Sequence, residues 1–289
     1  MTEFRGRGDE IRLAPLSFSE FMSAYDGGEE RGWQSYISYG GLPAVTLMDD
    51  PRDKADYLTR LFSEIYVSDI VERERVRNTR ALEELLDVMA STVGSLTSPS
   101  KTSKTFKSVT GMTIDPETVS SYIGYFPDAF LLERAKRYDV RGRHYIGTPH
   151  KYYFTDLGLR NARLGFRQVE QTHLMENAIY NELRDRGYVV DVGMVQVSER
   201  DGDGKARRRQ LEVDFVCNRG SERIYVQSAY DIPDAEKLAQ EQRPLDKIDD
   251  SFKKVIVVGR PIERHYGKTG VLTLGLYDFL LDPASVELG

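Results

Sequence analysis

Apolar residues recur at helical spacing in two long stretches of the first third of the chain. Intervals of three and four residues place such side chains on one face of a helix. We therefore predict amphipathic helices over residues 51–77 and 79–94. Their apolar positions are Tyr57, Leu58, Leu61, Phe62, Ile65 and Tyr66 in the first, and Leu82, Leu85, Leu86, Met89 and Val93 in the second.

Shorter elements precede these helices. Glu10 to Pro15 has the composition of a strand, and Leu16 to Phe21 is expected to open a helix with Ser17 or Ser19 as its N-cap. The pair Gly40-Gly41 is predicted to end a helix that begins near Trp33.

Between Thr97 and Tyr153 the pattern is a short helix, a turn, a second short helix and two β-like runs. Ser98-Pro99 and Asp115-Pro116 each combine a capping side chain with proline at the first helical position. The β-like runs are residues 131–138 and 145–154, with a turn at 141–143. This is the order of elements in a winged helix-turn-helix.

The pattern changes after Gly165. A helix is expected at 171–186, ended by Gly187, and the segment 199–209 is expected to be a mobile loop. One helix followed by several strands is typical of an α/β domain. The predicted strands are 188–197, 211–217, 223–229, 254–258 and 271–276, with a last helix beginning near Tyr277.

Composition narrows the class of protein. The chain has 289 residues, 40% of them hydrophobic, which is enough for two domains with real cores. Its single cysteine, Cys217, rules out a disulfide framework and fits a reducing compartment. The sequence shows neither a membrane span nor a signal peptide, so we expect a cytoplasmic protein.

Two carboxylates suggest a site for a divalent cation. Glu212 and Asp214 lie two apart on a predicted strand, so both should face one side, and Val213 and Phe215 the other. Mg²⁺ prefers oxygen ligands in near-octahedral geometry. The same alternation is also ordinary for a half-buried strand.

Together with Glu176 and Gln227, these residues resemble the metal site of a restriction-endonuclease-like nuclease. In that class, carboxylates from one helix and two adjacent strands hold a divalent cation, and a lysine two residues beyond the last ligand assists hydrolysis. The resemblance implies Mg²⁺ or Mn²⁺ on Glu176, Asp214 and Gln227, with Glu212 as a further ligand.

The resemblance is incomplete at two positions. Gln227 brings no negative charge, and Ala229 stands where active nucleases place the lysine. Arg223 or Lys205 are the candidates to replace that lysine. We therefore expect a degenerate site that does not cut.

The second half of the winged-helix region is basic although the net charge of the chain is −6. From Glu133 to Lys151, six Lys or Arg side chains stand against two acids. A winged helix of this charge is predicted to bind DNA, with groove contacts from its second helix and phosphate contacts around it. The groove residues are Thr118, Ser121 and Tyr122, and the phosphate contacts are Lys101, Lys104, Arg141, Arg143 and Lys151.

Several strings along the chain resemble the region that follows the ATPase module in a widespread group of prokaryotic AAA ATPases, a region that is itself a domain of unknown function. They include YGGLPAV (39–45), PHKYYFTDLGLRNARLG (149–165) and MENAIYNELRDRG (175–187). We expect the ATPase module itself to be missing from this chain. The only Gly-Lys-Thr, at 267–269, lacks the first glycine of a phosphate loop, so we expect no ATP on this chain.

These patterns together predict an α+β fold. Residues 1–30 are assigned to the junction with an ATPase, 31–165 to a helical and winged-helix domain, and 166–289 to a restriction-endonuclease-like α/β domain. The preferred function is a DNA-binding, nuclease-like accessory region of an AAA-type ATPase. Two alternatives stay open: a protein-interaction platform that binds no nucleic acid, and a metal-dependent DNA nuclease.

Overall fold

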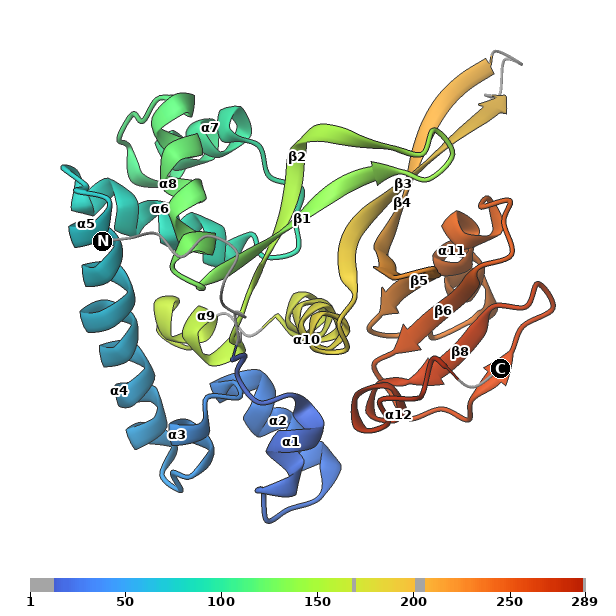
Figure 1. Ribbon diagram of the computed structural model, residues 1–289, viewed down its shortest axis with the longest axis horizontal. Helices are drawn as coiled ribbons and strands as arrows, with labels where there is room; N and C mark the ends of the chain where they lie inside the picture. The colour runs from blue at the N-terminus through green and yellow to red at the C-terminus, as the bar shows by residue number, and fades with distance from the viewer. Residues whose placement is uncertain (1–12, 168–169, 201–205, 288–289) are drawn as a thin grey trace, which may run out of the picture.

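The fold is α+β, as predicted, in the computed structural model, which describes residues 13–167, 170–200 and 206–287. A helical region comes first and a mixed sheet follows (Figure 1). The helices of the first region are α1 (Phe18–Ser23), α2 (Glu29–Tyr39), α3 (Pro43–Thr46), α4 (Pro51–Leu61), a π-helical turn (Phe62–Val67), α5 (Ser68–Arg73), α6 (Thr79–Ser91), α7 (Pro99–Thr110), α8 (Pro116–Asp128) and α9 (Leu157–Arg163).

Local capping chemistry sets the starts of these helices. The Ser17 side chain accepts from the backbone N–H of Glu20, and the Glu20 carboxylate accepts from Ser17 N in return, so α1 begins with a capping box. Ser98 and Asp115 cap α7 and α8 in front of their prolines, as predicted. Gly40 ends α2, also as predicted.

Two predictions for the first third of the chain are wrong. Leu13 to Pro15 form no strand, and the rest of the strand expected from Glu10 lies outside the described residues. The segment before α1 is instead held by a backbone hydrogen bond from Leu16 N to Gly41 O at 2.8 Å. The helix expected over 51–77 is interrupted by the π-helical turn and ends at Arg73, because the helical spacing of apolar residues does not reveal a change in hydrogen-bond register.

One eight-stranded sheet contains every named strand, in the order β2-β1-β3-β4-β5-β6-β8-β7. The hairpin β1–β2 comes from the predicted winged helix, yet Arg137 to Asp139 of β1 pair in parallel with Val192 to Met194 of β3. The sheet therefore extends across the expected boundary at 165/166. Its strands are β1 (Leu132–Asp139), β2 (His144–Phe154), β3 (Val189–Arg200), β4 (Ala206–Arg219), β5 (Glu222–Ala229), β6 (Lys253–Val258), β7 (His265–Tyr266) and β8 (Leu272–Gly275).

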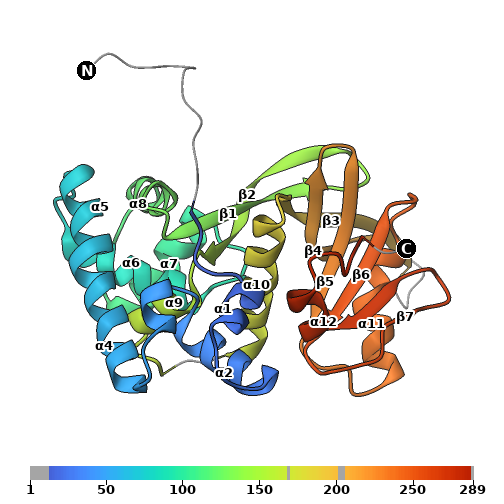
Figure 2. The same ribbon diagram turned by 60° about the horizontal axis from the view of Figure 1, so that its bottom comes forward.

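Helices cover both faces of this sheet. The helix α10 (Gln171–Asp185) stands between the helical region and the sheet, in both views, and α12 (Leu276–Leu281) packs beside it on β6 and β8 (Figures 1 and 2). On the other face, α11 (Ala235–Asp246) contacts β4, β5 and β6. One core cluster runs from the helical region under α10 and α12, and a second lies under α11.

The segment 199–209 is not a loop throughout. Residues 206–209 already belong to β4 and pair with the end of β3, while 201–205 lie outside the described residues. The Gly-Lys-Thr at 267–269 lies in the turn between the two short strands β7 and β8.

Candidate functional site

An irregularity in β4 presents two carboxylates on the same face of the sheet. The pairing with β3 moves from Asp191↔Val216 to Gly193↔Val213, so Asp214 and Phe215 lie opposite a single residue of β3. Such a bulge re-aims the side chains beside it. Val213 consequently packs under α11 and Phe215 under α10, which corrects the expectation that they share a face.

Lys151 lies at the centre of the candidate site. It belongs to β2, which is separated from the bulged strand β4 by β1 and β3 in the sheet. Its side chain is 4% exposed. Its Nζ lies 2.9 Å from Glu176 Oε1, 2.8 Å from Glu212 Oε1 and 3.6 Å from Asp214 Oδ1. Three of the four predicted metal ligands are thus gathered around one ammonium group.

Hydrogen bonds hold two of these carboxylates in place. The Tyr153 hydroxyl donates to Glu176 Oε1 at 2.7 Å, and its ring stacks on Tyr180 of α10 with centroids 4.2 Å apart. Ser228 N of β5 donates to Asp214 Oδ2 at 2.9 Å. Charged groups that are buried need such partners, because burial removes their hydration.

The charges of the cluster depend on one another. Burial alone lowers the pKa of Lys151, but Glu176, Asp214 and Glu212 together hold it above its ordinary value, so the amine stays protonated. Burial raises the pKa of Asp214 to about 7, and the Lys151 ammonium opposes that rise. Burial raises the pKa of Tyr153, and the nearby Glu176 carboxylate raises it further. The Tyr153 hydroxyl therefore keeps its proton and remains a hydrogen-bond donor.

The helical region also reaches the site. Gly94, in the connection from α6 to α7, has φ of +72°, and its N–H donates to Tyr152 O. A Cβ at this position would lie 3.1 Å from Glu176 Oε1. The absence of a side chain at Gly94 therefore lets the backbone approach the carboxylate closely.

Gln227, the fourth predicted metal ligand, points to the face of the sheet that α11 covers, and not toward Lys151. Tyr225 and Ala229, its neighbours two residues away on β5, pack in the cluster under α11, and the Gln227 amide donates to Glu241 of α11 at 3.3 Å. Its Oε1 accepts a hydrogen bond from Asp214 N at 3.4 Å. On β5 the residue that contacts the cluster is Ser228, through its backbone.

The arrangement does not fit a divalent cation as it stands. A cation needs the space between the carboxylate oxygens, and Lys151 Nζ already lies within salt-bridge distance of all three acids. Across residues 13–167, 170–200 and 206–287, no group of three or more His, Cys, Asp or Glu residues has a metal-binding arrangement. The Mg²⁺ or Mn²⁺ site stays a prediction.

Most of the DNA-binding candidates lie at the surface, on α7 and α8 or at the tip of the β1–β2 hairpin. Lys101, Lys104 and Ser121 are exposed on α7 and α8, and Arg141 and Arg143 are exposed at the tip of the β1–β2 hairpin. The Thr118 hydroxyl donates to the cap residue Asp115.

Two candidates are not available at the surface. Tyr122 is 9% exposed and packs in the core, because it shares the inner face of α8 with Val119 and Phe126. Lys151 is turned inward to the carboxylates, which corrects its assignment as an outer phosphate contact.

Arg137 is a further residue of this region that sequence reasoning missed. It is 8% exposed, and one of its terminal nitrogens donates to Gln210 Oε1 at 3.3 Å while its Nε has no partner among the described residues. With Arg134 and Lys136 it contributes to lowering the pKa of His150, after the larger effect of burial. Cations therefore concentrate on β1 around His150.

Neither Lys205 nor Arg223 is seen to replace the missing lysine. Lys205 lies outside the described residues. The Arg223 guanidinium lies over the rings of Tyr138 and Phe252, away from the carboxylates. Lys151 was missed for this role because it is 63 residues before Asp214 in the chain, and only the sheet brings the two together.

No helix of the described chain has both the length and the apolar character that crossing a membrane requires.

Among solved structures, protein VC1899 from Vibrio cholerae aligns with 98% of this chain and 63% of that one. The identity is 12% and the TM-score is 0.27, so this alignment carries no argument about the fold.

Two longer proteins are similar in sequence. An uncharacterised protein of Haemophilus influenzae is 34% identical over 288 residues, and uncharacterised protein MJ1544 of Methanocaldococcus jannaschii is 25% identical over 248 residues. The matches cover 97% and 82% of this chain, but only 66% and 53% of those relatives. Residues 30–170, which include Lys151 but none of the three carboxylates, match the family described as a domain of unknown function (DUF8612).

Proposed function

We propose that this chain is a nucleic-acid-binding, nuclease-like accessory region of an AAA-type ATPase that does not cut. The observation that carries the proposal is the position of Lys151, whose ammonium contacts Glu176, Glu212 and Asp214 where a nuclease would hold a metal ion. A fixed ammonium group offsets part of the charge of the carboxylates, but it cannot polarise a water molecule as a divalent cation does.

The surrounding fold supports a nuclease-like ancestry. Glu176 comes from the helix α10, and Asp214 from the middle strand of the antiparallel series β3, β4 and β5. The chain then crosses through α11 to β6, parallel to β5. A helix and two adjacent strands are the elements that hold the cation in the nuclease class that the sequence resembles.

Two features support nucleic acid as the partner. The helices α7 and α8 followed by the hairpin β1–β2 keep the order of a winged helix, with Lys101 and Lys104 exposed on α7. Arg137 adds a buried guanidinium with an unpartnered Nε, and guanidinium groups bind phosphate oxygens well. The net charge of −6 favours binding through these local groups over indiscriminate coating of DNA.

The test compares the wild type with Lys151→Met, in which the carboxylates lose their cation. We expect Mn²⁺ to raise the melting temperature of Lys151→Met, because the ion takes the vacated position, and to leave the wild type unchanged. Lys101→Met, an exposed lysine on α7, is the matched control and should behave as the wild type. A wild type that is itself stabilised by Mn²⁺, with the effect lost in Asp214→Asn, would overturn the proposed role of Lys151.

The nucleic-acid half of the proposal has its own readout. Fluorescence anisotropy of labelled duplex, single-stranded and branched DNA should show binding in EDTA that weakens steeply with salt. No binding to any of the three at low salt would favour the protein-interaction alternative.

A second candidate is a metal-dependent nuclease in which Lys151 supplies the lysine that Ala229 does not. The separation of 3.6 Å between Lys151 Nζ and Asp214 Oδ1 favours it, because a catalytic lysine has to lie beside the metal-binding carboxylate. Mn²⁺-dependent cleavage of DNA that is lost in both Lys151→Met and Asp214→Asn would select this candidate over the first.

A further inference from the structure

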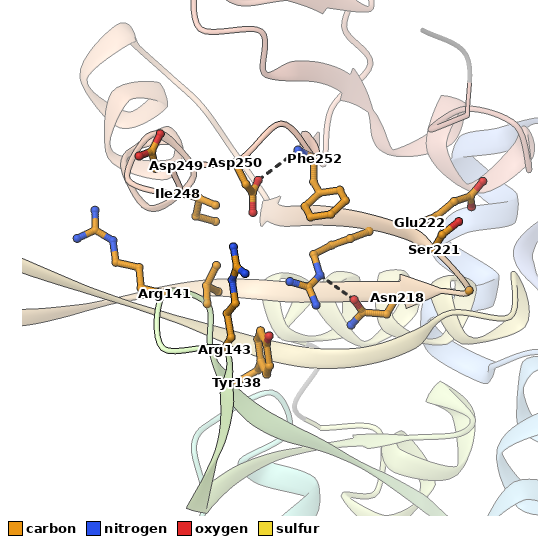
Figure 3. A pocket seen from close by; sticks show the side chains of 13 residues that line it. Tyr138, Arg141, Arg143, Asn218, Ser221, Glu222, Ile248, Asp249, Asp250 and Phe252 are labelled. Atoms are coloured by element: carbon orange, nitrogen blue, oxygen red, sulfur yellow. Dashed lines mark hydrogen bonds between the residues drawn. The ribbon is translucent and has the colours of Figure 1, made fainter.

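A cavity of about 730 Å³ lies on the other face of the sheet from the Lys151 cluster. Arg223 points to this face because it lies two residues before Tyr225 on β5, and Tyr225 packs under α11. The walls are the tip of the β1–β2 hairpin, the turn from β4 to β5, and the segment from Ile248 to Phe252 after α11 (Figure 3). The volume is in the range of pockets for small organic ligands.

Arg223 is held rigidly in this cavity. Its guanidinium lies over the ring of Tyr138 at 5.2 Å and over the ring of Phe252 at 5.5 Å. Its Nε donates to Asn218 Oδ1 at 2.7 Å, which leaves the amide N–H groups of Asn218 to donate elsewhere. A guanidinium fixed between two rings has little rotamer freedom left to lose on binding a ligand.

The hairpin tip adds two further arginines. Asp139 Oδ1 accepts from the backbone N–H groups of Arg141 and Gly142, which fixes the turn, and an Arg141 terminal nitrogen donates to Lys247 O at 3.0 Å. Arg143 has φ of +54°, and its side chain points into the middle of the cavity (Figure 3). No ion pair or hydrogen bond links the Arg143 guanidinium to the described part of the chain.

Two of the three acids that line the cavity have partners within the protein, and the third, Asp249, is exposed. Asp250 accepts from the Tyr225 hydroxyl at 2.6 Å and from Phe252 N at 3.2 Å. The Glu222 carboxylate pairs with Arg219 at 3.0 Å, and in Figure 3 it lies at the end of the cavity away from Arg143. The centre of the cavity therefore offers guanidinium donors next to an aromatic surface, with Phe252 40% exposed.

We propose that this cavity binds a nucleotide. The phosphate would pair with Arg143 and Arg141, and the base would lie against the exposed part of the Phe252 ring. Guanidinium groups bind phosphate through paired hydrogen bonds, and nucleic-acid bases stack on aromatic side chains. The chemistry fits a free mononucleotide and the 5′-phosphorylated end of a strand alike. The proposal does not rest on the proposed function, because the cavity and the Lys151 cluster lie on opposite faces of the sheet.

The test measures binding of three probes by calorimetry: adenosine 5′-monophosphate, a 5′-phosphorylated oligonucleotide, and inorganic phosphate. Arg143→Gly removes the free guanidinium while suiting the positive φ. Arg75→Gly is the matched control, because Arg75 is also exposed, also has a positive φ of 52°, and lies in the helical region.

We expect one of the two nucleotide probes to bind, and Arg143→Gly to weaken it at least tenfold while Arg75→Gly leaves it unchanged. Binding of the mononucleotide identifies a free ligand, and binding of the oligonucleotide alone identifies a strand end. Equal losses in the two variants, no binding of either nucleotide, or inorganic phosphate binding as tightly as the nucleotide would overturn the proposal. If the duplex anisotropy titration still shows binding in any of those cases, the failure concerns the cavity and leaves the proposed function standing.

Discussion

The carboxylate of Asp156 fills the space into which a side chain on Gly40 would project. Asp156 is 2% exposed and caps α9 by accepting from Leu159 N at 2.9 Å. Its second oxygen accepts from Gly41 N at 2.8 Å, so one side chain joins the start of α9 to the end of α2. This contact positions the helical region against the strand that carries Lys151, since Asp156 lies two residues after the end of β2.

Gly40→Ala is expected to destabilise the protein strongly. Gly40 has φ of 76° and ψ of −166°, a conformation that costs a residue with a Cβ about 1–3 kcal/mol. The clash with Asp156 should add roughly 1–3 kcal/mol more. Urea unfolding measures the loss, with Gly111→Ala as the control, because Gly111 has φ of 73° but no atom near the added Cβ. Equal losses in the two variants would contradict the importance of the Asp156 contact.

Asp156 should also make stability depend on pH. Burial raises its pKa to about 6, against the opposing effect of the backbone hydrogen bonds that it accepts. Because the native carboxyl holds its proton more tightly than the unfolded one, the contribution of this group is greatest below pH 4 and is lost as the pH rises through about 6. The size of the effect is at most about 3 kcal/mol.

The comparison for this prediction is Asp156→Asn, which does not titrate. The difference in unfolding free energy between the wild type and Asp156→Asn should shift in favour of the wild type as the pH falls from 7.5 to 4.5. A difference that stays constant over this range would show that the native pKa of Asp156 is not raised.

Lys151→Met is expected to cost roughly 3–5 kcal/mol in unfolding free energy, because removing one partner leaves buried charges uncompensated. Lys136→Met is the control: Lys136 is exposed on the neighbouring strand, and its nitrogen lies 5.6 Å from the ring of Tyr145. Adding Glu176→Gln to Lys151→Met should recover part of the loss, since it removes one of the unpaired carboxylates. A variant as stable as the wild type would mean that the cluster is hydrated or protonated without Lys151.

Local chemistry explains which elements could be predicted. The caps at Ser17, Ser98 and Asp115 act within three residues, and the apolar periods of α6 and α10 are long enough to be recognised in the sequence. The helix α11 was not predicted, because its residues are mostly polar and Pro244 lies within it.

The candidate site depends on contacts that are distant in sequence. Glu176, Glu212 and Asp214 could be grouped from the family resemblance, but the pairing of β1 with β3 that brings β2 into the sheet has no local signal. The burial of Lys151 follows from that pairing. The bulge in β4 also has no signature, because Glu212 to Phe215 reads as regular alternation.

Binding of DNA through α7 should depend on salt. Lys101→Glu and Lys104→Glu, each on the exposed face of the helix, should weaken duplex binding and lower the slope of log K against log salt by about 1 per lysine. Lys268→Glu is the control, because Lys268 is equally exposed but lies in the turn between β7 and β8. Anisotropy titrations from 50 to 200 mM salt give the slopes. If the α7 variants and Lys268→Glu share one slope, phosphate contacts come from another surface, and the winged-helix interpretation of α7 and α8 fails.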